Sequence, residues 1–252
     1  MKVVSNDLIA DNIYKLIIKG DIVEKMDIPG QFVNVKVGSG QEFPLRRPIS
    51  ICEINKGRNE FVLIYRALGD GTKELSKLKE NDDIDILGPL GTGYDISTIS
   101  KNEIALLVGG GIGVPPLYEL AKQFVNNGIE VVSVLGFNNK KDVFYVDEFK
   151  KFGKTYISTV DGSFGEKGYV TDIILNNNIK YDKYYACGPN NMLRALKYLD
   201  ENKKGFISLE ERMACGIGAC FACVCKTKDE QVTRICKEGP VYSSDLINFD
   251  KE

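Results

Sequence analysis

The sequence predicts a β plus α/β protein in three parts. We expect an antiparallel β-barrel over residues 1–98, a doubly wound parallel α/β domain over 99–208 and a small cysteine-rich segment over 209–252. Three observations predict this order: short alternating strands between turn residues come first, strands alternating with helices follow, and five of the seven cysteines stand after residue 210.

The N-terminal part has apolar, β-branched or aromatic residues at every second position, separated by Gly, Asp and Asn turns. This pattern favours a small antiparallel barrel. A short helix is expected over Lys73–Leu78, and Gly88–Gly93 reads as a stiff Gly/Pro hinge that ends the barrel. The candidate strands are Ile13–Ile18, Phe32–Val37, Ile49–Glu53, Glu60–Arg66 and Asp83–Leu87.

The middle part begins with Glu103–Val108, a continuous apolar run that is typical of a strand buried on both faces of a parallel sheet. A glycine-rich turn follows, and then Leu117, Leu120, Ala121 and Phe124 recur at helical spacing. Further strands are expected at Glu130–Leu135, Thr155–Val160 and Tyr184–Cys187, with helical segments between them. This alternation predicts the doubly wound domain.

Composition excludes several functional classes. The net charge of −2 gives no basic stripe for nucleic acid. The N-terminus has no apolar signal region and no run approaches the length of a membrane span, so we expect a cytoplasmic protein. The chain has no histidine, which excludes Ser–His and Cys–His nucleophile pairs and histidine-ligated metals. We therefore expect no catalytic side chain in this protein, and chemistry from bound cofactors.

The C-terminal segment carries the most specific motif. Cys215, Cys220 and Cys223 have the spacing C-x4-C-x2-C, and Cys236 follows further along. This is the plant-type spacing of a [2Fe–2S] cluster, in which three thiolates lie on one loop and a fourth arrives from the next strand. Small residues let the backbone fold close around such a cluster, and they are Gly216, Gly218, Ala219 and Ala222.

Two other interpretations of these cysteines stay open at this point. A structural zinc also needs four ligands, but usually as two short pairs on separate knuckles. Disulfides would need an oxidising compartment. Cys225 stands two residues past Cys223 and reads as a packed thiol, with a ligand exchange left open.

Two turns of the α/β domain are candidate nucleotide sites. Gly109–Val114 follows a buried strand at a helix N-terminus, where glycines let backbone N–H groups approach a pyrophosphate. The loop departs from G-x-G-x-x-G, and an ordinary tight turn fits it equally well. Cys187-Gly188-Pro189 ends another strand at the same sheet edge, and its simpler interpretation is a buried cysteine before a helix.

The barrel has two candidate phosphate or ring sites. Arg46-Arg47-Pro48-Ile49-Ser50 places two guanidinium groups and a hydroxyl at the head of a strand, although a solvated edge would look the same. Gly71-Thr72, near the start of the short helix, is either a phosphate site or merely a cap.

A barrel, an α/β domain and a cysteine segment follow one another along the chain. With its parts in this order, the chain resembles the ferredoxin–NADP reductase superfamily. Within it, the sequence is most similar to electron-transfer subunits of NAD-dependent, B-type dihydroorotate dehydrogenase, over nearly the whole chain. The likeness rests on Arg47-Pro48-Ile49-Ser50, Ile64-Tyr65-Arg66, Gly71-Thr72, Gly109–Pro116, Cys187-Gly188-Pro189-Asn190, and the four spaced cysteines with Gly239-Pro240-Val241.

The resemblance implies an FAD site in the barrel, NAD on the α/β domain and a [2Fe–2S] cluster between this FAD and the FMN of a partner catalytic subunit. Electrons would pass from that FMN through cluster and FAD to NAD⁺, in pyrimidine (UMP) biosynthesis, within a heterotetramer of two copies of each subunit. Ile49 stands where many superfamily members have an aromatic residue. The implied site residues are Arg47, Pro48, Ile49, Ser50, Ile64, Tyr65, Arg66, Gly71 and Thr72 for FAD, Gly111, Gly113, Cys187, Gly188 and Pro189 for NAD, and Cys215, Cys220, Cys223 and Cys236 for the metal.

Two other functions are weighed against this one. The first is the small flavin and iron–sulfur subunit of an NAD(P)H–ferredoxin or sulfide oxidoreductase. Lys140 and Lys141 could then meet a 2′-phosphate, although solvated lysines are the simpler interpretation. The second is a zinc-binding regulatory module on an α/β scaffold, which would be colourless when purified.

Overall fold

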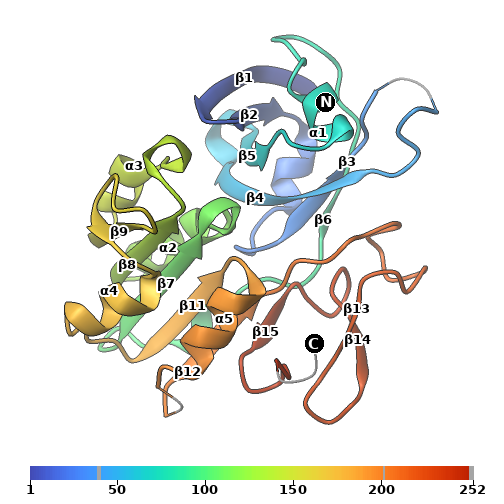
Figure 1. Ribbon diagram of the computed structural model, residues 1–252. Helices are drawn as coiled ribbons and strands as arrows, with labels where there is room; N and C mark the ends of the chain where they lie inside the picture. The colour runs from blue at the N-terminus through green and yellow to red at the C-terminus, as the bar shows by residue number, and fades with distance from the viewer. Residues whose placement is uncertain (39–40, 201, 250–252) are drawn as a thin grey trace.

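The structure, a computed structural model, describes residues 1–38, 41–200 and 202–249. Two large sheets stand side by side, and the C-terminal segment lies against both the N-terminal sheet and the second sheet (Figure 1). The arrangement confirms the predicted fold class, because the first sheet is antiparallel and the second is mainly parallel.

The first sheet is wound in the strand order β1-β2-β5-β4-β3-β6, with antiparallel pairs throughout. Backbone bonds close it, since the N–H of Val3 donates to the carbonyl of Asp82 at 3.0 Å and that of Ile84 to Met1 at 3.0 Å. Its strands are β1 (Lys2–Ala10), β2 (Ile13–Lys19), β3 (Phe32–Val35), β4 (Arg47–Asn55), β5 (Glu60–Arg66) and β6 (Ile86–Leu90), with the helix α1 (Asp70–Leu75) after β5.

The second sheet has the order β10-β9-β8-β7-β11-β12-β15, and only β15 runs antiparallel to its neighbour. The order reverses beside β7, so the carboxyl ends of β7 and β11 flank the switch point where such sheets bind ligands. Its strands are β7 (Ile104–Gly110), β8 (Glu130–Phe137), β9 (Lys154–Thr159), β10 (Glu166–Lys167), β11 (Lys183–Cys187), β12 (Lys204–Ser208) and β15 (Val241–Ser243).

Helices cover both faces of this sheet, because alternate strand residues point to opposite sides. Leu107 and Tyr185 face α2 and α3, whereas Leu106 and Tyr184 face α4 and α5. The helices are α2 (Pro116–Asn126), α3 (Val146–Lys150), α4 (Val170–Asn176) and α5 (Asn190–Lys197). Short 3₁₀ turns lie at Asp21–Lys25, Lys56–Arg58, Ile96–Thr98, Gly111–Gly113 and Lys140–Asp142.

One apolar core joins the barrel to the α/β sheet. Ile13, Cys52 and Ile64 of the barrel belong to the same buried cluster as Leu117 and Phe124 of α2. Because these residues exclude water together, the two parts are packed as one body at this interface.

The C-terminal segment adds a hairpin, β13 (Val224–Lys226) and β14 (Val232–Arg234), and then supplies β15 to the edge of the large sheet. Its cysteine loop, residues 215–223, precedes β13. The segment is therefore fastened to the α/β part by backbone pairing, and the domain boundaries expected from the sequence stay a prediction.

Several elements differ from their expected bounds. β1 is not among the expected strands, because Asn6 and Asp7 disfavour strands; this edge strand is only partly buried. Gly88–Leu90 lie inside β6 and not in a hinge, and α1 begins at Asp70, so Gly71 and Thr72 are inside it.

Candidate functional site

A cavity of about 300 Å³, here called the barrel cavity, opens between β4 and β5 of the barrel and the chain that follows β12. Eight of the nine residues implied for FAD line it. They are Arg47, Pro48, Ile49, Ser50, Ile64, Tyr65, Arg66 and Thr72. The last residue of β12, Ser208, also lines it, and the chain after β12 contributes Leu209, Glu210, Glu211, Met213 and Pro240.

The ninth residue, Gly71, supports the cavity from behind. A Cβ atom on Gly71 would lie 2.4 Å from Nε of Arg47, so a larger residue at this position would displace the guanidinium from α1. The Thr72 hydroxyl donates to the carbonyl of Gly69 at 3.0 Å. Arg46 turns away and forms a two-pronged ion pair with Asp85 at 3.0 and 2.9 Å. Of the two adjacent arginines, Arg47 is the one that reaches the cavity.

Tyr65, one of the residues that line the barrel cavity, is held by a hydrogen bond and by ring stacking. The Tyr65 hydroxyl donates to Oδ1 of Asn6 at 3.0 Å, and its ring stacks on Tyr14 at 5.7 Å between centroids. Ile49 is buried in the barrel core as well as lining the cavity. An aliphatic side chain therefore stands where an aromatic one would stack on a bound ring.

A second cavity of about 810 Å³, here called the sheet cavity, lies over the carboxyl edge of the large sheet. Gly111, Gly113, Gly188 and Pro189 line it, as the resemblance implies for NAD. A Cβ atom on Gly113 would lie 2.3 Å from the carbonyl oxygen of Cys187. The turns after β7 and β11 are thus in van der Waals contact, which is why this position takes only glycine.

Cys187 differs from the other residues implied for NAD. It is buried beneath the two turns and is not among the described residues that line either cavity. Desolvation raises the pKa of its thiol well above the ordinary value, and the nearby Glu210 carboxylate raises it further. A role for Cys187 in contact with NAD stays a prediction.

The two cavities meet at three shared residues, Arg66, Ile112 and Glu210. Arg66 lies 3.7 Å from the Asp142 carboxylate, and its Nε is buried without a hydrogen-bond partner among the described residues. An unpaired buried donor at this junction is suited to a polar ligand. Ile112 and Glu210 were not expected as site residues, although Glu210 stands just after a strand that ends at the ligand-binding edge.

The four spaced cysteines come together as two pairs. The backbone N–H of Cys220 donates to Sγ of Cys215 at 3.4 Å, and the backbone N–H of Cys236 donates to Sγ of Cys223 at 3.4 Å. No three Cys, Asp or Glu side chains within residues 1–38, 41–200 and 202–249 are arranged to hold a single metal ion. Two pairs of thiols are the donor set of a binuclear cluster, one pair for each iron.

Backbone N–H groups point at these sulfurs. Ile217, Ala219 and Cys220 donate to Sγ of Cys215 at 3.3–3.5 Å, and Gly218 donates to Sγ of Cys236 at 3.1 Å. Desolvation raises the pKa of Cys215, but these N–H groups outweigh it and lower the pKa to about 6. Donors aimed at a thiolate also tune the potential of a bound cluster.

Contacts from outside hold the cysteine loop in place. The Asn34 side chain of β3 donates to the carbonyl of Cys215 at 3.3 Å, and Arg234 of β14 donates to that of Gly218 at 2.8 Å. The barrel and the hairpin thus each form a hydrogen bond to the loop backbone. Cys225 is half-buried beside it, and desolvation, with Glu211 and Cys223 nearby, raises its pKa to about 11.

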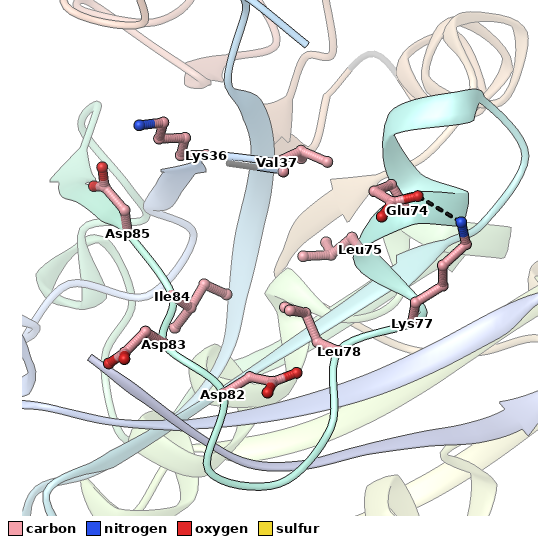
Figure 2. Close-up of a pocket in the computed structure, with 11 residues that line it drawn as sticks. Lys36, Val37, Glu74, Leu75, Lys77, Leu78, Asp82, Asp83, Ile84 and Asp85 are labelled. Atoms are coloured by element: carbon pink, nitrogen blue, oxygen red, sulfur yellow. Dashed lines mark hydrogen bonds and ion pairs between the residues drawn. The ribbon is translucent and has the colours of Figure 1, made fainter. Parts of the chain in front are cut away.

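A third cavity, of about 540 Å³, lies between α1 and the chain that leads into β6, and none of the implied site residues is among the described residues that line it (Figure 2). Three of the carboxylates in its wall are already in ion pairs: Glu74 with Lys77, Asp83 with Lys2 and Asp85 with Arg46. We therefore assign no site there.

Two family models match the chain. Residues 107–197 match an oxidoreductase NAD-binding domain, and residues 210–248 match the iron–sulfur cluster binding domain of dihydroorotate dehydrogenase B. The described helices include none that is long and apolar enough to cross a membrane. A cytoplasmic location stays a prediction.

Relatives cover almost the whole chain. A dihydroorotate dehydrogenase B (NAD⁺) electron transfer subunit of Fusobacterium nucleatum is 57% identical over 250 residues, 97% of this chain and 96% of the relative. An electron transfer subunit of the same name from Geobacillus sp. (strain WCH70) is 53% identical over 246 residues, which are 97% of this chain and 96% of that relative. A solved structure of NADH-dependent reduced ferredoxin–NADP oxidoreductase, studied for flavin-based electron bifurcation, superposes with a TM-score of 0.88 at 31% identity and covers 99% of this chain and 90% of that one.

The barrel, the NAD-binding sheet and the cysteine segment define an oxidoreductase with a ferredoxin–NADP reductase-like fold, a fold that binds FAD. It transfers electrons to NAD⁺ and carries an iron–sulfur cluster-binding domain. The chain belongs to the family of electron-transfer subunits of NAD-dependent dihydroorotate dehydrogenase B. An electron-transfer subunit of this kind implies a separate catalytic partner.

Proposed function

We propose that FAD lies in the barrel cavity, that NAD lies in the sheet cavity, and that the four paired thiols hold a [2Fe–2S] cluster. The partner holds FMN and oxidises dihydroorotate, and two copies of each subunit assemble. This chain then carries the electrons onward to NAD⁺ and supplies no group that reacts with dihydroorotate. The proposed ligands of the cluster are Cys215, Cys220, Cys223 and Cys236.

One observation carries this proposal. Met213 lines the barrel cavity, and Cys215 stands only two residues further along the chain. The first cluster ligand is therefore held beside the flavin site by a very short piece of backbone. Short separation between redox groups is what efficient electron transfer between them requires.

The side chains present fit the proposed groups. Arg47 offers a guanidinium that can bind phosphate bidentately, and the buried Nε of Arg66, where the two cavities meet, has no hydrogen-bond partner in the described part of the chain. The thiols are four in number and lie in two neighbouring pairs, as the ligands of a [2Fe–2S] cluster do. When bound, a flavin supplies exchange between hydride chemistry and single-electron chemistry, which none of this chain's side chains can provide.

A second candidate, the flavin and iron–sulfur subunit of an NAD(P)H–ferredoxin or sulfide oxidoreductase, is favoured by the match to the solved oxidoreductase structure. The higher identity of the dihydroorotate dehydrogenase relatives favours the first proposal. Lys140 and Lys141 are exposed and are not among the described residues that line the sheet cavity. NADH should therefore reduce the purified protein much faster than NADPH does.

The test uses chain purified anaerobically together with an FMN-containing dihydroorotate dehydrogenase. We expect bound FAD, two irons and two acid-labile sulfides per chain, as a [2Fe–2S] cluster requires, and orotate formation coupled to NAD⁺ reduction. Cys220→Ala should abolish the cluster's electron paramagnetic resonance signal and the coupled reaction. Reduction of a dye by NADH should survive, because dye and NADH both meet the flavin directly.

Cys225→Ala is the matched control, since Cys225 lies on the hairpin beside the loop and is not a proposed ligand. It should leave the signal and the coupled activity in place. A colourless protein without iron or sulfide would contradict the proposal, and so would coupled activity that survives Cys220→Ala.

A further inference from the structure

The interface between barrel and α/β sheet contains a buried carboxylate that neither cavity uses. Glu119 of α2 is only 3% exposed. Its Oε2 accepts the backbone N–H of Ile54 in β4 at 2.9 Å. Lys122, one turn further along α2, lies 2.8 Å from the same carboxylate and donates to the carbonyl of Ile54 at 2.7 Å. The pair therefore holds both polar groups of one barrel residue.

The local shape of β4 prepares this contact. β4 has a register shift against β5 between Ile51 and Glu53, so Cys52 is an extra residue in the strand. Such a bulge bends a strand and re-aims its neighbours. A third residue of the same helix face, Gln123, donates to Oε1 of Glu119 at 3.1 Å and to the carbonyl of Asp27 at 3.0 Å. Three side chains of α2 thus hold the barrel backbone at two residues, Ile54 and Asp27.

Each end of this contact is tied to one of the two cavities. Ser50, in the wall of the barrel cavity, and Ile54 belong to the same strand. Gly113, in the wall of the sheet cavity, stands just before α2, which carries Glu119. A strand and a helix are stiff over so few residues. The contact therefore fixes how far the two cavity walls stand from each other.

We propose that Glu119, with Lys122, is a positioning residue for electron transfer to NAD⁺. It holds the loop Gly111–Gly113, which lines the sheet cavity, at a fixed distance from the barrel cavity. The inference rests on the proposed function, which places FAD and NAD in these two cavities. Glu119 touches neither cavity and has no part in binding either cofactor. It acts through the geometry of the loop after β7.

The decisive variant is Glu119→Met with Lys122→Met. Glu119 is buried and Lys122 is half-buried, and replacing such an ion pair by apolar side chains of similar volume is often tolerated, whereas the backbone of Ile54 loses its anchors. We expect the rate at which saturating NADH bleaches bound FAD, followed by stopped flow, to fall about tenfold or more, since small misplacements of reacting groups have such effects. The dissociation constant of NADH should change by less than about twofold.

Glu103→Gln is the matched control. Glu103 also pairs with a lysine, Lys183, and accepts a backbone N–H, that of Ser100, but all three groups lie outside the barrel strands. Its loss should leave the bleaching rate within about twofold of the unmodified chain. Rates are taken per bound FAD, so that a change in cofactor content does not enter the comparison. If the double variant does not fold, Gln123→Ala, which removes the contact to Asp27, is measured in its place.

Unchanged bleaching rates in the double variant, or in Gln123→Ala where that stands in, would overturn the inference. A matching fall in Glu103→Gln would also overturn it, because the loss would then follow from any broken ion pair. The proposed function fails separately: in that case the unmodified chain itself binds no FAD or shows no bleaching by NADH.

Discussion

At the scale of single residues, the cysteine loop depends on groups that bind no metal themselves. Arg234 donates to the carbonyl of Gly218, forms an ion pair with Glu238 and stacks its guanidinium over Phe221 at 4.9 Å from the ring centroid. Because Cys236 stands between Arg234 and Glu238 in the chain, this network holds the fourth thiol against the loop that carries the other three.

Glu238 gives this network a pH dependence. Hydrogen bonding to Arg234 lowers the pKa of its carboxyl from 4.5 to about 2. A carboxyl with a depressed pKa contributes stability that is complete above its unfolded pKa and is lost as the pH falls from about 4.5 towards 2. The side chain is 40% exposed, so solvent screening limits the contribution to below about 1 kcal/mol.

We therefore expect Glu238→Gln to lower the urea midpoint slightly at pH 7, and we expect the difference from the unmodified chain to shrink as the pH falls from about 4.5 towards 2. Urea unfolding followed at several pH values measures this difference. Glu230→Gln is a control, because Glu230 also forms an exposed ion pair, with Lys226, on the same hairpin. A difference between Glu238→Gln and the unmodified chain that grows on acidification would contradict the prediction.

At the scale of elements, the sheet cavity is made by two turns that touch. The loop after β7 and the turn after β11 approach so closely that a Cβ atom on Gly113 would meet the backbone of Cys187 and Gly188. Backbone cannot move aside as a flexible side chain can. The width of the cavity is therefore set by this contact and by the parallel pairing of the two strands.

Gly113→Ala should push the two turns apart. We expect the dissociation constant of NADH to rise about tenfold or more, because both turns lie in the cavity wall and shape changes in a packed region cost about 1–3 kcal/mol. FAD content should stay unchanged. Gly57→Ala is the control, since its nearest atom lies at an ordinary 3.6 Å. Fluorescence titration with NADH measures both, and equal affinities in the two variants would contradict the expectation.

At the scale of the whole molecule, barrel and α/β sheet share one core. The cluster that contains Ile13, Cys52 and Ile64 of the barrel also contains Leu117 and Phe124 of α2. Exposing one side of this cluster to water exposes the other. The two parts are therefore expected to lose their structure together.

Calorimetry should record a single unfolding transition for the protein with its cofactors bound. NADH at about a hundred times its dissociation constant should raise the midpoint of that transition by about 5–10 °C, since binding to the folded state alone adds about 2.7 kcal/mol. Two separate transitions, with only one of them moved by NADH, would contradict the shared core. AMP in place of NADH serves as a comparison ligand that lacks the nicotinamide.

Features that depend on residues close together in the sequence could be predicted, whereas contacts between residues far apart in the sequence could not. The cysteine spacing and the strand Glu60–Arg66 are local patterns, so they were readable directly, and β5 has those bounds. The contact of Glu119 with Ile54 joins residues far apart in the chain, and nothing near either of them signals it. Met213 has no motif of its own, and it lines a cavity only because β12 delivers the chain to that edge.

The strand β15 has a practical consequence for anyone who wishes to shorten this chain. Its residues Val241–Ser243 cover one side of β12. Removing everything after residue 208 would expose the unpaired backbone N–H and C=O groups along this edge of β12. Strands of other molecules could then pair with that edge. A truncated chain is thus expected to aggregate. The cluster-binding segment therefore also protects the NAD-binding sheet from aggregation, because its strand β15 pairs with the exposed edge of β12.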